Sequence, residues 1–574
     1  MIIKNAKIYT MAMSSSADEP KIIENGYVKI SGGLIAEVGD MKSYDATIGN
    51  ENFEKSDNNI IEAGGKWLLP GFIDAHTHLG MYEDGIRNEG DDLNEVTDPC
   101  SPQLRAIDAI NPMDRTFDEA LSAGITCVAT GPGSANPISG QFAAIKTHGK
   151  RIDGMILKEP ASMKFALGEN PKICYGEKNQ APETRMATAA IIRENLRKAQ
   201  KYGVKKSEAE ISANAENPDE TDKIDEPDFD IKLESLLPVL NKEIPAHIHA
   251  HRADDIFTAI RICKEFDIDY VIVHCTDGHL IAEELAKDKV RAIVGPIICD
   301  RSKPEMKNLE LKNAKILNDA GILFSLTTDH PVAPLQYLPQ CAALAVKGGL
   351  DFYDAIKAIT INPAVILGID NFVGSVEKGK HADLVLYSGN PLEIANAAEI
   401  VIVGGEIVKT DEKSLQNAVV SKLREKNLTL ATAESCTGGL IGKRITDVSG
   451  SSSVYLGGII SYDNSVKVKQ LNVSEETLKR CGAVSEQTAL EMCKGAAKNL
   501  NADIGVSTTG IAGPGGGSNE KPVGLVYVGV YYKNKETGEE IHRTVRLNLS
   551  QCGDREAIRY AAASNALHEV LKLV

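Results

Sequence analysis

The feature that most constrains this chain is an apolar run, Trp67 to Ile73, that leads directly into two histidines spaced His-x-His. The run predicts a buried strand. Residues i and i+2 of a strand point to the same face, so His76 and His78 can bind one metal ion at the carboxyl end of that strand. Two unrelated surface histidines are the alternative. The Pro-Gly pair within the run, together with Asp74 two residues before His76, favours the metal site.

The length and composition are those of a multidomain globular protein. A chain of 574 residues exceeds what one hydrophobic core organises, so we expect two or three domains. The net charge of −17 argues against a nucleic-acid partner, which would need clustered Lys and Arg. No apolar run approaches the ~20 residues that cross a bilayer, and the 11 cysteines form no Cys-x-x-Cys pair. We therefore expect a cytoplasmic protein with reduced thiols and no membrane partner.

From residue 67 onward, strand-like runs alternate with helix-like segments, which is typical of a (β/α)8 barrel. The seven runs after the first are Gly124–Thr130, Gln141–Thr147, Ser162–Ala166, Ile244–His249, Tyr270–His274, Arg291–Gly295 and Ile322–Thr328. Residues 205–233 are acidic and poor in apolar side chains, which predicts a solvated loop or, alternatively, a mobile lid over the barrel mouth.

Further metal-type side chains stand at the ends of these later strands. His247, His249 and His251 alternate on one face, His274 ends the next strand, and Asp329 follows the last one. All strands of a parallel barrel end at one mouth, so these side chains would meet in space. Imidazole and carboxylate groups suit Zn²⁺ and similar ions. Any one of these residues alone is a weak signal, but the ordered set indicates a metal centre.

This ordered set resembles the metal-dependent amidohydrolase superfamily, and the stretches Thr130–Gly140 and Leu167–Pro171 resemble its imidazolonepropionase-like branch. The resemblance implies one or two divalent cations, with zinc as the first choice. The ligands that it implies are His76, His78, His249, His274 and Asp329. It further implies a bridging residue on the fourth strand, Lys164, with Lys158 and Glu159 as nearby alternatives.

Three further histidines are candidates for this pocket. His251 is expected to contact substrate, although His251 or His247 could take the place of His249 as a ligand. His330 could also face the pocket. The implied reaction is hydrolysis of an amide, a cyclic amide or a related C–N bond. A divalent cation lowers the pKa of bound water from about 15.7 to about 7, and Asp329 would accept the proton and pass it to the leaving amine.

The two ends of this region predict a small β-domain. Strand-like segments Met1–Tyr9, Gly26–Ile30 and Leu34–Val38 precede the barrel, and segments Gly379–Tyr387 and Val401–Val408 follow it. By the same resemblance, residues 1–66 and 372–411 form the two halves of one β-sandwich around a barrel of residues 67–371.

A second pattern begins at residue 412. The amphipathic segment Asp411–Lys426 opens it, and a strand over Leu428–Ala433 leads into Glu434-Ser435-Cys436-Thr437-Gly438-Gly439, followed by a helix over Leu440–Thr446. This places Ser435 near a helix N-terminus, where unpaired N–H groups can hold an oxyanion. A hairpin over residues 524–547 and a closing helix over residues 554–571 complete a predicted α/β layered domain, residues 412–574.

This domain resembles the CinA C-terminal family, the nicotinamide-nucleotide amidases. The matching stretches are residues 433–439, 457–467, 482–485, 509–516 and 521–524. The resemblance implies Ser435 as the nucleophile, Lys467 as the general base and Tyr462 as a proton relay, with no cofactor. Cys436 is an alternative nucleophile. The implied reaction is deamidation of nicotinamide mononucleotide to nicotinate mononucleotide and ammonia.

The substrate-binding residues expected in this domain lie in two loops. They are Thr437, Gly438, Thr509, Gly510 and Gly513. The glycine-rich stretch Thr509–Gly517 follows a strand, so its backbone N–H groups could cradle a nucleotide phosphate, although it could also be a plain surface loop.

Together the two resemblances predict a bifunctional hydrolase that acts on small-molecule amides and on nicotinamide mononucleotide. The alternative is that one domain, first of all the barrel, is a non-catalytic ligand-binding or assembly module. Because members of both families commonly associate, we expect a homo-oligomer.

Overall fold

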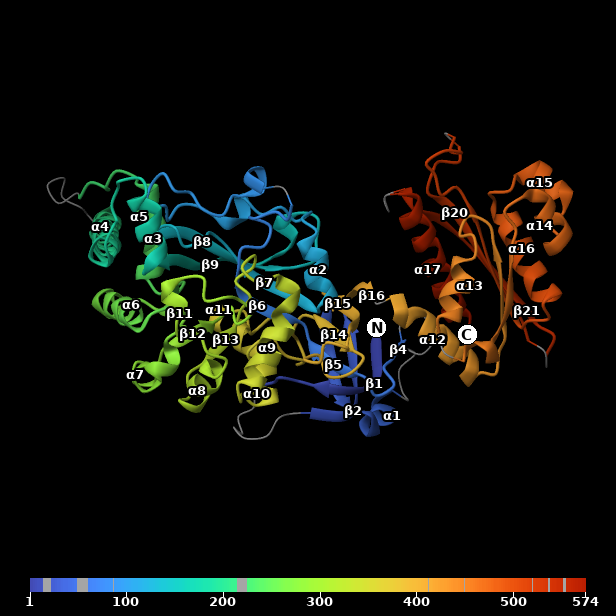
Figure 1. Cartoon of the computed structure of the whole chain (residues 1–574), viewed down its shortest axis with the longest axis horizontal. Coiled ribbons are helices and arrows are strands. Elements are labelled where there is room, and N and C mark those ends of the chain that lie inside the picture. The colour runs from blue at the N-terminus through green and yellow to red at the C-terminus, as the bar shows by residue number, and fades with distance from the viewer. Residues whose placement is uncertain are drawn as a thin grey trace. The chain divides into compact units, whose positions relative to one another are not determined.

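The computed structural model describes residues 1–13, 22–48, 60–85, 87–213, 224–410, 412–448, 450–518, 520–534, 537–550 and 554–574. The described residues form two compact units, one from Met1 to Lys409 and one from Thr410 to Val574 (Figure 1). None of the described helices has the length and apolar character that a membrane span requires.

Strands from both ends of the first unit form one mixed sheet of eight strands. The leading strands are β1 (Ile2–Tyr9), β2 (Ile22–Ser31), β3 (Leu34–Asp40), β4 (Ile60–Glu62) and β5 (Trp67–Pro70), with the helix α1 (Met41–Ile48) after β3. The trailing strands are β14 (Leu384–Tyr387), β15 (Ala398–Val403) and β16 (Glu406–Thr410). β14 pairs antiparallel with β5, which joins the two sets and confirms the predicted composite β-domain.

The second sheet of this unit is the predicted eight-stranded barrel. Its strands are β6 (Phe72–Thr77), β7 (Ile125–Thr130), β8 (Ile138–Lys146), β9 (Ile156–Ala166), β10 (Ala246–Ala250), β11 (Tyr270–His274), β12 (Arg291–Val294) and β13 (Phe324–Leu326). They are hydrogen-bonded in chain order. The barrel is near-closed, because the Thr327 hydroxyl oxygen, just after β13, lies 2.6 Å from the His76 carbonyl oxygen on β6.

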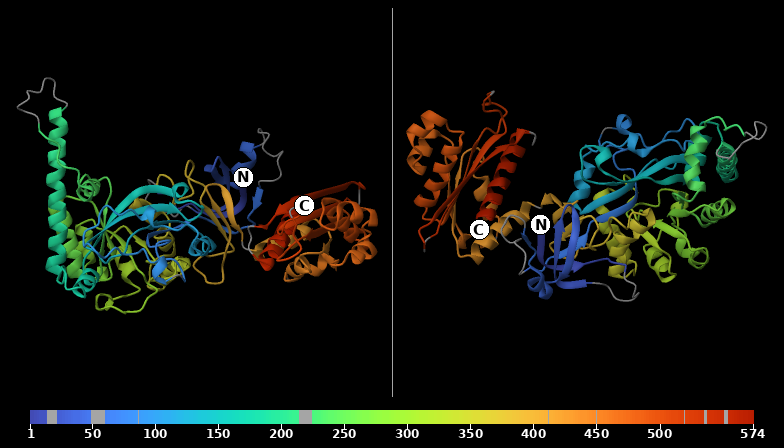
Figure 2. Two further views of the ribbon diagram at one scale, coloured as in Figure 1. Left: turned by 90° about the horizontal axis from the view of Figure 1, so that it is seen from above. Right: turned by 180° about the vertical axis from the view of Figure 1, so that it is seen from behind.

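Helices cover the outside of the barrel (Figures 1 and 2). They are α2 (Thr116–Ser122), α3 (Glu169–Gly176), α4 (Arg185–Ala213), α5 (Ile231–Leu240), α6 (Ala253–Phe266), α7 (Ala282–Lys287), α8 (Asn313–Asp319), α9 (Leu338–Lys347) and α10 (Phe352–Lys357). A further helix, α11 (Ile361–Leu367), packs instead against a separate core cluster of strand residues that includes Phe142 and Val273. The main hydrophobic core lies between these helices and the strands.

Two strand predictions need correction. The apolar run from Trp67 to Ile73 is not one barrel strand, because β5 belongs to the composite sheet and the barrel begins with β6. Gly71 lies at this break, where a Cβ atom would lie 2.0 Å from the Thr126 hydroxyl. The barrel is also not fully parallel, since β8 runs antiparallel to β7 and β9. The segments that flank β8 are shorter than the dozen residues that a parallel crossover needs.

The loop predicted for residues 205–233 is wrong at both of its ends. Residues 205–213 continue the long helix α4, and residues 231–233 begin α5. The alanine, glutamate and lysine side chains of the first stretch are strong helix formers. The hydroxyl of Tyr202 donates to Glu234 at 2.9 Å, which ties α4 to α5. Figure 2 shows α4 at the outer edge of the unit, and residues 214–223 lie outside the described residues.

The second unit is the predicted α/β layered domain. Its strands are β17 (Leu430–Glu434), β18 (Tyr455–Ile460), β19 (Ile504–Gly510), β20 (Leu525–Lys533) and β21 (Glu540–Asn548), in the sheet order β18-β17-β19-β20-β21. The first three are parallel and the last two antiparallel. Part of the turn predicted between β20 and β21 lies outside the described residues.

Helices lie on both faces of this sheet (Figure 1). α12 (Glu412–Glu425), α13 (Leu440–Thr446) and α17 (Arg555–Leu573) share one core with the strands. α14 (Asn464–Leu471), α15 (Glu475–Cys481) and α16 (Glu486–Asn499) lie on the other face.

Candidate functional sites

The barrel gathers most of the predicted metal-type side chains into two neighbouring groups. His76, His78 and Asp329 form the first group, and their ligand atoms all lie within 4.8 Å of one another. Oδ1 of Asp329 lies 3.6 Å from Nε2 of His76 and 3.5 Å from Nε2 of His78. We call these three residues the first histidine group. His76 lies in β6 and His78 directly follows it, whereas Asp329 lies three residues after the end of β13.

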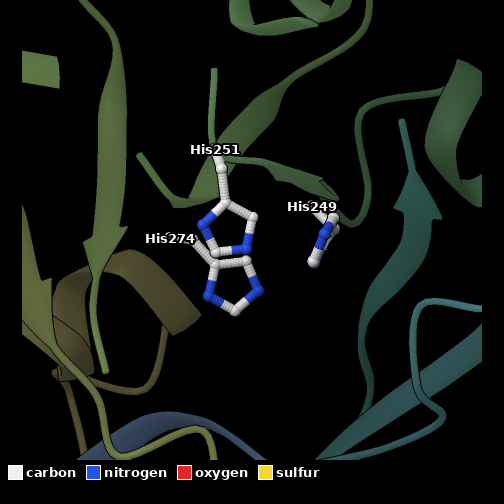
Figure 3. Close-up of side chains that lie close together, drawn as sticks. All are labelled: His249, His251 and His274. Atoms are coloured by element: carbon white, nitrogen blue, oxygen red, sulfur yellow. The ribbon is translucent and has the colours of Figure 1, made fainter. Parts of the chain in front are cut away.

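His249, His251 and His274 form the second histidine group, again with ligand atoms within 4.8 Å of one another (Figure 3). The rings of His251 and His274 are stacked, with centroids 4.3 Å apart and planes 4° apart. The ring of His249 lies to one side, 4.5 Å from that of His274. The groups adjoin, because the ring centroids of His76 and His274 are 5.8 Å apart.

A hydrogen bond at Nδ1 sets the orientation of two of these rings. Nδ1 of His78 lies 2.6 Å from the Gly131 carbonyl, and Nδ1 of His274 lies 2.8 Å from the Gly295 carbonyl. A carbonyl oxygen can only accept, so Nδ1 carries a proton in both rings, and Nε2 is the nitrogen that is left to bind a metal. Metal-bound histidines typically show this arrangement.

The charge state of the buried histidines also suits metal binding. Burial holds the pKa values of His76, His249 and His274 well below 6.5, so these imidazoles are neutral at physiological pH. Neutral imidazole is the form that ligates a metal. Nδ1 of His76 and both ring nitrogens of His249 are buried and have no hydrogen-bond partner among the described residues. Such orphaned nitrogens fit a site built to hold a divalent cation.

The backbone at two of these positions is unusual. His274 has a φ of 73° and Asp329 has a φ of 52°, in the left-handed region that non-glycine residues rarely adopt. Such strain often marks functional sites, where the surrounding structure holds it in place.

Of the three candidates for the bridging residue, Lys164 lies beside the first histidine group. Its Nζ lies 2.9 Å from Nε2 of His76, and burial lowers the pKa of Lys164 to about 7. Lys158 instead donates to the Leu367 carbonyl at 3.0 Å. Glu159 accepts from Arg105 at 2.8 Å.

The two remaining histidine candidates lie outside both groups. His247 is buried directly opposite Lys164 in the β9–β10 register. His330 is buried, and its ring nitrogens have no hydrogen-bond partner among the described residues. Glu305, which sequence reasoning missed, lies 3.5 Å from His249, in the 3₁₀ helix Pro304–Met306. It follows no strand directly, so no pattern pointed to it.

The second unit brings two predicted catalytic residues together. Nζ of Lys467 donates to Oγ of Ser435 at 3.2 Å and to the Ser461 carbonyl at 2.7 Å. Lys467 is 1% exposed, and burial lowers its pKa. A buried amine with a lowered pKa can accept a proton from a neighbouring hydroxyl. The pair therefore has the geometry of a nucleophile with its general base.

The predicted relay residue Tyr462 is placed differently from this pair. Its side chain is 64% exposed, and its hydroxyl accepts from Arg555 at 2.9 Å. The contact of Tyr462 with Lys467 is through the backbone carbonyl, at 3.4 Å.

The N-terminus of α13 is only partly open to an oxyanion. The buried carboxylate of Glu434 accepts from the N–H groups of Gly439, Ile441 and Gly442 at 2.8 to 3.1 Å. Within the described residues, the N–H of Gly438 has no hydrogen-bond acceptor, and Gly438 is exposed. An oxyanion site beside Ser435 would therefore use this earlier part of the turn.

Two arginines of α17 reach the loops that carry the predicted substrate residues. Arg559 donates to the Thr437 carbonyl at 2.7 Å, and Arg555 donates to the Gly513 carbonyl. The hydroxyl of Thr437 is bonded to that of Thr508 at 2.6 Å, and the hydroxyl of Thr509 donates to the Ala483 carbonyl at 2.7 Å. Gly510 ends β19. Sequence reasoning missed both arginines, which look like ordinary residues of an amphipathic helix.

Comparison with known proteins gives matches to both units. A model described as the amidohydrolase family matches residues 67–410, and one described as the CinA C-terminal domain matches residues 412–574. A solved amidohydrolase from Thermotoga maritima MSB8 is 39% identical, with a TM-score of 0.64. That match covers 71% of this chain and 100% of the other.

Curated relatives match the second unit. CinA-like proteins from Dictyoglomus turgidum and Kosmotoga olearia are 50% and 51% identical over 165 residues. Each match covers 29% of this chain and 38% of the relative, so this chain spans less than two-fifths of their length. The chain belongs to the amidohydrolase family and carries, fused after that region, a CinA C-terminal domain.

Proposed function

We propose that this protein is a bifunctional hydrolase of C–N bonds. The barrel would hydrolyse an amide or cyclic amide with one or two divalent cations, zinc being the first choice. The second unit would deamidate nicotinamide mononucleotide without a metal. The observation that carries the proposal is that each unit holds one buried set of catalytic-type side chains: the two histidine groups with Asp329 in the barrel, and Ser435 with Lys467 in the second unit.

In the barrel, the residues that would hold a cation are those of the two histidine groups, with Lys164 beside them. When bound, a divalent cation supplies Lewis acidity toward water and toward the carbonyl under attack. Asp329 lies among the ligand nitrogens, where its second oxygen can take a proton from water and return it to the leaving amine. Phe142, stacked on His76 with centroids 4.9 Å apart, helps to exclude water from the inner side of the site.

In the second unit, Ser435 would attack the carboxamide carbon while its proton moves to Nζ of Lys467. The tetrahedral oxyanion would accept a hydrogen bond from the N–H of Gly438. Collapse then breaks the C–N bond, and Lys467 returns the proton to the departing ammonia. A water molecule hydrolyses the resulting ester and regenerates Ser435. Arg555 and Arg559 border this site and supply positive charge for the nucleotide phosphate.

Cys436 is a weaker candidate for the nucleophile. Burial raises the pKa of its thiol to about 11, so the reactive thiolate is scarce at neutral pH. Ammonia release from nicotinamide mononucleotide by the full chain separates the two residues. We expect Ser435→Ala to abolish release and Cys436→Ala to retain it. The reverse pattern would assign the nucleophile to Cys436, and no release by the wild type would contradict the amidase proposal.

For the barrel, a screen of amides and lactams with the zinc-loaded chain tests the proposal. Hydrolysis that disappears in Asp329→Asn supports catalysis by the barrel. Metal binding without turnover of any amide would favour the alternative, a ligand-binding or assembly module.

A further inference from the structure

A buried carboxylate borders the second histidine group. The side chain of Glu305 is 1% exposed, and its Oε1 lies 3.5 Å from Nε2 of His249 and 3.7 Å from Nε2 of His251. Its other oxygen, Oε2, accepts the N–H of Glu169 at 3.1 Å. Oε1 has no hydrogen-bond partner among the described residues, so one carboxylate oxygen points at the histidines without being satisfied.

The separations around Oε1 match those of ligands that share an ion. They are longer than an N–H···O hydrogen bond, which is about 2.7 to 3.2 Å. Two ligand atoms, each about 2.0 to 2.2 Å from a tetrahedral zinc ion, lie roughly 3.4 Å apart. The first histidine group shows the same spacing, since Asp329 lies 3.6 Å from His76 and 3.5 Å from His78. The Glu305 carboxylate therefore lies at about the same distance from two histidine nitrogens of the second group as the Asp329 carboxylate does from those of the first.

The ring geometry of the second histidine group indicates that a metal ion bound there needs a ligand in addition to the three histidines. An ion bound to an imidazole lies near the plane of the ring. The rings of His251 and His274 are parallel and 4.3 Å apart, so one ion cannot lie in both planes (Figure 3). His249 and one stacked ring leave the ion short of ligands, and Glu305 is within reach of both His249 and His251.

Electrostatics also favours a cation at this point. A buried carboxylate without a counter-charge costs several kcal/mol. Within the described chain, no lysine or arginine forms an ion pair with Glu305, and the two histidines beside it, whose pKa values are lowered by burial, supply no positive charge. A divalent cation would neutralise the carboxylate and use the lone pairs of the histidines at once.

We propose that Glu305 is a ligand of a second divalent cation, which it holds together with His249 and His251. The first cation would be held by the first histidine group. This inference rests on the proposed metal dependence of the barrel, which already allows two cations, and what it adds is Glu305 as a ligand. His251, expected from the sequence to contact substrate, becomes a ligand. Its Nδ1 lies 2.8 Å from the hydroxyl of Thr276, which can hold the ring with Nε2 toward the ion.

Metal content of the full chain gives the first test. Wild-type protein, Glu305→Gln and Glu310→Gln are loaded with zinc, dialysed and analysed by inductively coupled plasma mass spectrometry. Glu310 is exposed five residues further along, so Glu310→Gln is a matched control for the change of charge. We expect about two ions per chain in the wild type and the control, and about one in Glu305→Gln. Equal metal content in all three proteins would overturn the inference.

A gain of signal gives a second test that a structural role could not produce. In the cobalt-loaded Glu305→Cys variant, a thiolate at this position would ligate the ion and add a near-ultraviolet sulfur-to-cobalt charge-transfer band that is absent from the wild type. If the circular dichroism spectrum shows that Glu305→Gln is unfolded, the charge-transfer band of Glu305→Cys becomes the deciding measurement. The absence of this band would overturn the inference. A wild type that binds no ion would contradict the proposed function as well, whereas a metal-loaded wild type with unaffected variants contradicts the Glu305 inference alone.

Discussion

The side-chain nitrogen of Lys467 lies 3.2 Å from the hydroxyl oxygen of Ser435, although the two residues are 32 positions apart. Ser435 follows β17, and Lys467 lies in the first turns of α14, just after β18. β17 and β18 are parallel neighbours, so their carboxyl ends bring these two segments to the same edge of the sheet. The Ser461 carbonyl accepts a second hydrogen bond from Lys467 and fixes the amine toward Ser435.

This geometry predicts how ammonia release depends on pH. A general base must be deprotonated, and burial lowers the pKa of Lys467 below 10.5. Activity should therefore rise with pH through this lowered pKa and be lost as the pH falls below it. Lys467→Arg, which stays protonated, should reduce kcat by about 100-fold or more, whereas exposed Lys469→Arg should not. A pH–rate profile with nicotinamide mononucleotide measures both, and full activity in Lys467→Arg would remove the residue from the mechanism.

Glu434 should stabilise the turn that carries Ser435. Its buried carboxylate accepts from three N–H groups at the start of α13, so Glu434→Ala leaves those groups unsatisfied. We expect a loss of roughly 1 to 3 kcal/mol in the free energy of unfolding of the second unit. Hydrogen exchange of α13 by mass spectrometry should report faster exchange in Glu434→Ala than in the exposed control Glu476→Ala. Equal protection in both variants would mean that the cap contributes nothing.

Asp74 should position the first histidine group without binding metal itself. Its carboxylate accepts from the hydroxyls of Thr327 and Thr328 at 2.6 and 2.7 Å and from the N–H of His76 at 3.1 Å. These bonds tie the segment before His78 to the segment before Asp329. In Asp74→Asn the amide NH₂ would face donors, and we expect zinc affinity to fall by about 10- to 100-fold.

Competition with a chromogenic chelator measures this affinity, with exposed Asp300→Asn as the control. Unchanged affinity in Asp74→Asn would show that the carboxylate serves folding alone.

Much of the barrel site could be predicted because parallel strands end at one mouth. His76, His249 and His274 stand at or near strand ends, and the sequence shows these as apolar runs that stop at a histidine. Glu305 could not be found in this way, because a 3₁₀ helix within the loop after β12 carries it to the site. Arg555 and Arg559 were missed for a related reason, since a helix face reveals its partner only once the tertiary fold is known.

The errors in the fold have equally specific causes. The run from Trp67 to Ile73 reads as one strand because nothing in its hydropathy marks the step at Gly71 from one sheet to the next. Strand direction is also invisible to hydropathy, so β8 was predicted as parallel although its short flanking loops favour a hairpin. Acidic composition suggested a loop at residues 205–213, but alanine, glutamate and lysine at these positions also form a good solvent-exposed helix.

The central claim is that the histidines of the barrel bind divalent cations, and the metal content of His76→Ala tests it most directly. His148 is exposed and outside both histidine groups, so His148→Ala is the matched control. We predict one or two ions per chain in the wild type and in His148→Ala, and fewer by at least one in His76→Ala. A metal-free wild type, or the same metal content in all three proteins, would contradict the account.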